Sequence, residues 1–87
     1  MLTWQDCVEL SELTGDEIAA IAEHEHITSM AALELGNYLT HTASGEKRIK
    51  SMILDDIRDA KASGKADHAL ALKLVLKNFV EHHPAAR

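Results

Sequence analysis

Two apolar stripes at helical spacing constrain the fold more than any other feature of the sequence. The first stripe consists of Ile49, Met52, Ile53, Ile57 and Ala60, and the second of Ala69, Leu72, Leu76, Phe79 and Val80. Spacings of three and four place side chains on one face of an α-helix. Ser63-Gly64 lies between the stripes and is expected to end the first helix, because glycine tolerates the left-handed conformation that ends many helices. The sequence therefore predicts an antiparallel helical hairpin over residues 44–83, capped by Ser44.

Shorter helices are predicted before the hairpin. Thr3 and Asp6, and again Thr14 and Glu17, have the spacing of a capping box at a helix start. The second of these helices should become less stable near His26. The β-branched residues Ile27 and Thr28 follow there, and Thr28-Ser29 can cap the start of another helix. We expect a third helix from about Met30 to Thr40. Its expected buried side consists of Ala31, Leu35, Tyr38 and Leu39.

The predicted fold is a single all-α domain over residues 1–87. It is a small bundle of four or five helices, with short acidic helices in residues 1–43 and the long hairpin in residues 44–83. No strand pattern competes with this interpretation. Of the hydrophobic residues that make up 46% of the chain, only three are aromatic, so we expect a modest aliphatic core. A chain this short buries about two-thirds of its unfolded surface, which leaves a small margin of stability.

The formal charge is divided unevenly along the chain. Residues 1–45 carry eight acidic residues and no Lys or Arg, a charge of −8, whereas residues 46–87 carry nine bases and six acids, a charge of +3; together these give the net −5. Such asymmetry indicates an interaction surface. Because both halves have regular apolar periodicity, neither is predicted to be a disordered tail.

Composition also excludes several classes of protein. No apolar run reaches the roughly 18 residues that a membrane-spanning helix needs, and the opening residues lack the basic and apolar regions of a secretory signal. Cys7 is the single cysteine, so an internal disulfide and a multi-cysteine zinc site are excluded. These features favour a reducing, cytoplasmic environment.

The run Glu23-His24-Glu25-His26 contains four residues of metal-ligating type. Successive helix residues point about 100° apart, so only Glu23 and His26 share a face. Glu34 and His41 lie on a polar stripe of the next predicted helix. If the two helices fold against each other, Glu23, His26, Glu34 and His41 form a candidate site for a divalent metal ion or a small ligand. A solvated helix surface is the commoner meaning of both patterns.

Glu25 continues the apolar stripe of the second helix, four residues after Ile21 and three after Ala22. A regular helix would aim its carboxylate toward the core, where burial raises a carboxyl pKa. We favour the alternative, in which the helix ends near His24 and Glu25 reaches water.

The second and third predicted helices resemble a helix-turn-helix module over about 25 residues, from Thr14-x-x-Glu17-Ile18 to Ile27-Thr28-Ser29. The resemblance implies DNA binding, with residues 29–40 as the recognition helix. That segment contains Glu34 and no Lys or Arg, whereas DNA affinity depends on basic residues that neutralise phosphates. We therefore expect no nucleic-acid partner.

The favoured function is a small self-associating interaction module, either a homo-oligomer or a protein with another protein partner. The broad apolar face of the last helix, widened by Leu70 and Leu74, exceeds what a few short helices can cover. The alternative is a metal- or ligand-binding protein that uses the Glu/His cluster. We expect no enzyme, because the chain has no catalytic motif and is short for a small-molecule pocket.

Overall fold

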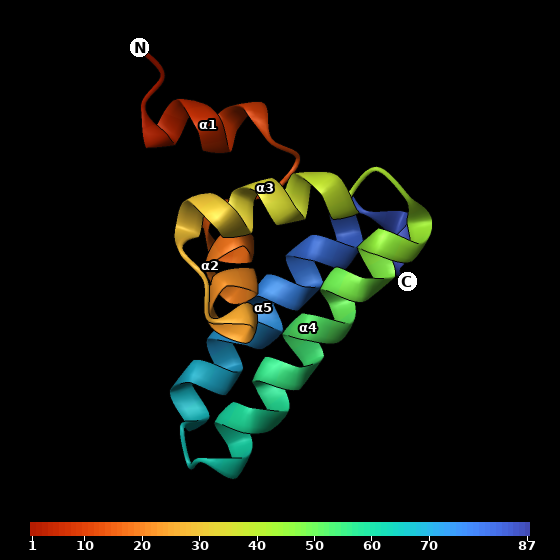
Figure 1. Ribbon diagram of the computed structural model, residues 1–87. Helices are drawn as coiled ribbons and strands as arrows, with labels where there is room; N and C mark the ends of the chain where they lie inside the picture. Colours follow the sequence, from red (N-terminus) through yellow and green to blue (C-terminus); the bar gives the residue numbers. More distant parts are fainter.

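The computed structural model describes residues 1–87, and all of its regular structure is helical (Figure 1). In chain order the elements are α1 (Trp4–Leu10), α2 (Gly15–Glu25), α3 (Ser29–Leu39), α4 (Ala43–Ala62), α5 (Ala66–His82) and a final 3-10 turn, η1 (Pro84–Ala86). The predicted all-α fold of four or five helices is confirmed. No helix is long and apolar enough to cross a membrane.

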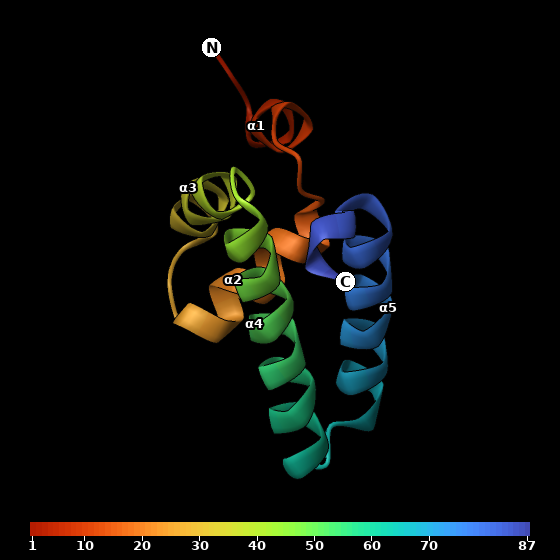
Figure 2. The ribbon, with the colours of Figure 1, turned by 90° about the vertical axis from the view of Figure 1, so that its right-hand side faces the viewer.

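Helices α4 and α5 form the predicted antiparallel hairpin, and they run side by side along the long dimension of the molecule (Figure 2). Ser63 caps the end of α4, and Gly64 follows with a φ of 73°, the left-handed conformation that the turn requires. The prediction that Ser44 caps the hairpin is wrong. Thr42 caps α4 instead, because its hydroxyl accepts a hydrogen bond from the Gly45 amide at 3.0 Å.

The hairpin supplies half of the 16 buried hydrophobic residues that form the core. All five residues of the α4 stripe are buried, as are Ala69, Leu72 and Phe79 of α5. Phe79 is fully buried, whereas Trp4 and Tyr38 are exposed. The core is therefore aliphatic around one aromatic ring, as the composition predicted.

Helix α2 packs against α3 and α4 and, more sparsely, against α5. Thr14 and Glu17 form the predicted capping box at its start. The helix ends at Glu25, and His26 follows as a C-cap with a φ of 55°, so the predicted weakening near His26 is confirmed.

Helix α3 buries a different face from the one predicted. Its buried residues are Ala32, Leu33, Gly36 and Leu39, whereas Tyr38 is 75% exposed and Ala31 and Leu35 are only partly buried. Gly36 explains the difference, because a Cβ at this position would lie 2.3 Å from the Leu13 side chain. The missing side chain lets α3 approach Leu13 with its glycine face.

Helix α1 stands away from the rest of the bundle and lies beyond α3 (Figure 1). The predicted capping box between Thr3 and Asp6 is present, but the helix contains no buried residue. Only Cys7 and Val8 of α1 pack against the core. The bundle proper is therefore formed by α2 to α5.

Candidate functional site

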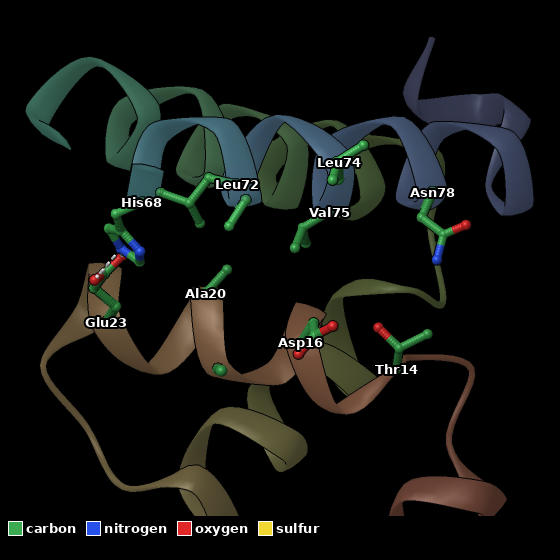
Figure 3. Close-up of a pocket in the computed structure, with 11 residues that line it drawn as sticks. Thr14, Asp16, Ala20, Glu23, His68, Leu72, Leu74, Val75 and Asn78 are labelled. Carbon is green, nitrogen blue, oxygen red and sulfur yellow. Dashed lines mark hydrogen bonds and ion pairs between the residues drawn. The ribbon is translucent and has the colours of Figure 1, made fainter. Parts of the chain in front are cut away.

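A groove separates α2 from α5 along the side of the bundle (Figure 3). Its volume is about 430 Å³, and its apolar lining consists of Ala19, Ala20, Ala71, Leu72, Leu74 and Val75. Ala20 points from α2 toward Leu72 and Val75 of α5 (Figure 3). The α2 wall is made of alanines, whose single methyl groups are too short to fill the space between the helices. We call this feature the α2–α5 groove.

Polar side chains close both ends of the groove. Thr14, Asp16 and Asn78 lie toward one end, and Glu23 and His68 lie at the other (Figure 3). The Nε2 atom of His68 lies 2.8 Å from Oε1 and 3.1 Å from Oε2 of Glu23. Both side chains are about half exposed. This pair links α2 to the first turn of α5.

Beyond the Glu23–His68 pair lies a second, polar cavity of about 170 Å³, which we call the polar hollow. The end of α2, the C-terminal part of α4 and the start of α5 surround it. Its lining consists of Glu23, His24, His26, Asp56, Asp59, Ala60, Ser63, Lys65 and His68. Carboxylates and imidazoles therefore come together here from three helices.

His24 is held at the border of the polar hollow by two carboxylates. Its Nδ1 lies 2.8 Å from Glu25 Oε2, and its Nε2 lies 3.2 Å from Asp55 Oδ2. Partial burial alone would lower the pKa of His24, but the hydrogen bonds to Glu25 and Asp55 outweigh it, so its pKa is raised. These contacts fix the end of α2 against α4.

Asp56 is the most unusual residue of the hollow. It is 5% exposed, and its Oδ2 atom is shielded from solvent without a hydrogen-bond partner. Burial raises the pKa of Asp56 to about 6, and the neighbouring charge of Glu23 adds to the effect. The folded chain thus leaves one carboxylate oxygen unsatisfied.

The structure does not bring the four predicted metal ligands together. Glu23 and His26 both line the polar hollow, but Glu34 is exposed on α3 and His41 bonds through Nδ1 to the Asn37 carbonyl oxygen. No group of three or more His, Cys, Asp or Glu side chains is placed to hold a metal ion as the side chains stand. The predicted set therefore does not form one site, because Glu34 and His41 do not line the polar hollow.

Glu25 is partly exposed and pairs with His24, in agreement with the interpretation that it reaches solvent. Sequence reasoning missed two other carboxylates that are buried, Glu17 and Asp56. The signal for Asp56 was present, because Asp56 follows Met52 by four residues and precedes Ala60 by four. It therefore lies on the apolar stripe of α4.

The outer face of α5 carries a second exposed feature, which we call the α5 seam. It consists of Asp67, Leu70, Leu74 and Lys77, all exposed, with Leu70 and Leu74 at 60% and 63%. Their spacing of three, four and three residues places them along one face of the helix. Neither Asp67 nor Lys77 takes part in an ion pair within the chain.

Comparisons of the chain with models of protein families, with curated proteins and with solved structures give no match.

Proposed function

We propose that the protein is a self-associating interaction module in which two copies pair through their α5 seams, antiparallel to each other. The observation that supports this proposal is that the seam is complementary to itself. Asp67 and Lys77 are equidistant from residue 72, and so are Leu70 and Leu74. In an antiparallel pair centred on Leu72, Asp67 of one copy therefore faces Lys77 of the other.

The same register sets Leu70 of each copy opposite Leu74 of the other. A two-fold axis repeats every contact, so the pair has two leucine contacts and two ion pairs, as expected for an isologous interface. Full burial of a leucine side chain stabilises by about 1.5–3 kcal/mol. Because Leu70 and Leu74 are more than half exposed in one copy, most of that stabilisation is available to association.

The α2–α5 groove borders the seam, and Leu74 belongs to both. A second copy's α5 lying on the seam would extend along the open side of the groove and shield its apolar lining. The charges at the seam ends set the register of the pair rather than its strength, since an exposed ion pair contributes only about 0.2–1 kcal/mol.

This pairing differs from a head-to-tail contact between the acidic first half and the basic second half of the chain. The seam carries both signs of charge on one helix, so it needs no contribution from α1 to α3. The proposal is for a binding protein rather than an enzyme, with another copy of itself and no nucleic acid as partner. Its sole cysteine fits a cytoplasmic setting.

Sedimentation of charge-swapped variants tests the register. Asp67→Lys places two lysines opposite each other at both ends of the pair, and Lys77→Asp does the same with aspartates, so each variant should form a weaker dimer than the wild type. The double variant Asp67→Lys, Lys77→Asp restores both attractions and should dimerise as tightly as the wild type. Glu34→Lys is the matched control, because it makes the same charge change at an exposed site on α3.

A second pair of variants tests the apolar contact. Leu70→Asp should give a monomer, whereas Leu10→Asp on α1, where Leu10 is 75% exposed, should not. Circular dichroism establishes that each variant is folded. A wild-type chain that is monomeric at high micromolar concentration and low salt would overturn the proposal. So would a folded double charge swap that remains monomeric.

A further inference from the structure

One side of α4 carries a row of basic residues, which we call the basic stripe. The stripe is centred on Leu54, and its bases lie four and seven residues before and after that leucine: Lys47, Lys50, Arg58 and Lys61. Spacings of three and four place all five residues on one side of the helix. At about 1.5 Å per residue, the stripe extends over about 21 Å. It therefore runs along most of α4, and the residues that α4 buries are a separate set.

The basic stripe is open to solvent and largely without counter-charges. All of its residues are exposed except Lys50, which is partly buried. None of its three lysines takes part in an ion pair within the chain. Arg58 lies 3.5 Å from Asp55, but the Arg58 side chain is 76% exposed, and Asp55 also bonds to His24. The chain thus leaves most of the positive charge of the stripe unneutralised.

Helix α5 adds a further base at one end of the stripe. Lys73 lies beside Lys61, and a hydrogen bond and charge repulsion from the Lys73 side chain lower the pKa of Lys61. Two basic side chains from different helices therefore meet at the surface. Since neighbouring like charges disfavour the charged form of each other, this arrangement becomes favourable when an anionic group lies against both.

The composition of the stripe favours an acidic helix as the anionic partner over a nucleic acid. Leu54 is 39% exposed between the bases, where it offers an apolar contact that a phosphate does not use. Asp55 and Asp59 lie on the same helix beside the stripe, and residues 1–45 carry a charge of −8. A nucleic acid has phosphates around its whole circumference and would be repelled by these acids. A helix with acidic residues on one face would contact the stripe alone.

We propose that the basic stripe is a docking site for an acidic amphipathic helix of another protein. In this complex an apolar side chain of the partner lies on Leu54, and acidic side chains on either side of it face the four bases. A helix laid along α4 has the same rise per residue, so its acidic residues stay in register with the bases over the length of the stripe. The stripe shares no residue with the α5 seam, so this site does not depend on self-association.

Titration of the full-length chain with a labelled helical peptide tests the proposal. The peptide has a leucine at its centre and glutamates four and seven residues before and after it. A peptide of the same composition, with the glutamates spread around the helix, is its control. Fluorescence anisotropy should show binding of the first peptide at micromolar concentration in low salt, and binding of the control roughly tenfold weaker. Raising the salt to about 0.5 M should weaken the binding at least tenfold, because salt screens exposed charges.

Charge reversal along α4 locates the binding site. Arg58→Glu and Lys50→Glu should each weaken peptide binding roughly threefold or more, the effect expected when an exposed attraction becomes a repulsion. Arg48→Glu is the matched control, because Arg48 is an exposed arginine of the same helix that lies outside the stripe. This variant should bind the peptide as the wild type does. Circular dichroism establishes that each variant is folded.

Absence of binding at millimolar peptide would overturn the proposal. Equal binding of the two peptides, or equal losses in Arg58→Glu and Arg48→Glu, would also overturn it, because each result would show an attraction to net charge alone. Tighter binding of a short DNA duplex at the same stripe would refute the choice of partner. Sedimentation of Arg58→Glu, which leaves the α5 seam intact, should give the same dimer as the wild type, so the two proposals can fail independently.

Discussion

Replacing Asp56 with asparagine should stabilise the protein at neutral pH. Asp56 is 5% exposed, and burial together with the charge of Glu23 raises its pKa from 3.8 to about 6. Because the pKa is higher in the folded chain than in the unfolded chain, the protonated carboxyl favours folding. The stability that is present below about pH 4 is therefore lost as the pH rises through 6. Asparagine stays neutral at every pH, so the Asp56→Asn variant should keep this stability.

The size of the effect follows from the pKa. Each pKa unit corresponds to about 1.4 kcal/mol, so the rise from 3.8 to about 6 corresponds to roughly 3 kcal/mol. This value is a ceiling, because Glu23 and Asp59 are exposed and water screens their charges. We expect Asp56→Asn to gain about 1–3 kcal/mol in free energy of unfolding near pH 7.5.

Urea denaturation followed by circular dichroism measures this difference. The free energies of unfolding of the wild type and of Asp56→Asn are compared at about pH 4, 5, 6 and 7.5. The difference between them should be small near pH 4 and should grow through the range between the two pKa values. A difference that is the same at every pH would refute the reasoning, because it would show that Asp56 has the same pKa in the folded and unfolded chains.

Three further predictions concern other parts of the fold. Burial raises the pKa of Glu17 despite its hydrogen bonds with Thr14; Glu17→Gln should therefore become more stable relative to wild type as the pH rises above 4.5, and a pH-independent difference in urea denaturation would contradict this. At Gly45 a Cβ would lie 1.9 Å from the Leu39 carbonyl oxygen, whereas at Gly36 it would meet a movable side chain. Gly36→Ala should cost about 1–3 kcal/mol in free energy of unfolding and Gly45→Ala clearly more, so equal melting temperatures would be evidence against the close approach of Gly45 to the Leu39 carbonyl group. Amide hydrogens of α1 should exchange with solvent before those of α4, since α1 contains no buried residue; equal protection by mass spectrometry would contradict its placement.

The hairpin could be predicted from the sequence because its signals are local. Apolar spacing along each helix and the Ser63-Gly64 stop together determine two helices and their antiparallel arrangement. The buried face of α3 could not be predicted in the same way. Its sequence has apolar residues on every side, so periodicity does not select one face. The choice depends on the close approach of Gly36 to Leu13, a residue outside the helix.

In the candidate sites, too, features that depend on local sequence could be predicted, and features that depend on contacts between distant residues could not. Asp56 could have been identified from its place on the α4 stripe, by the reasoning that was applied to Glu25. The Glu23–His68 pair joins residues 45 positions apart and depends on how α2 lies on α5. The groove is a space between these same helices. Neither the Glu23–His68 pair nor the groove can be predicted from the sequence of α2 or of α5 alone.

The Glu23–His68 pair separates the two cavities, since its two side chains line both the α2–α5 groove and the polar hollow. A rotation of this pair reshapes both cavities at once. An occupant of one cavity that favours one orientation of the pair therefore changes the affinity of the other cavity for its own occupant. Thermodynamic linkage makes these two effects equal in free energy. The two cavities of this small bundle thus share one exposed hydrogen bond as their common boundary.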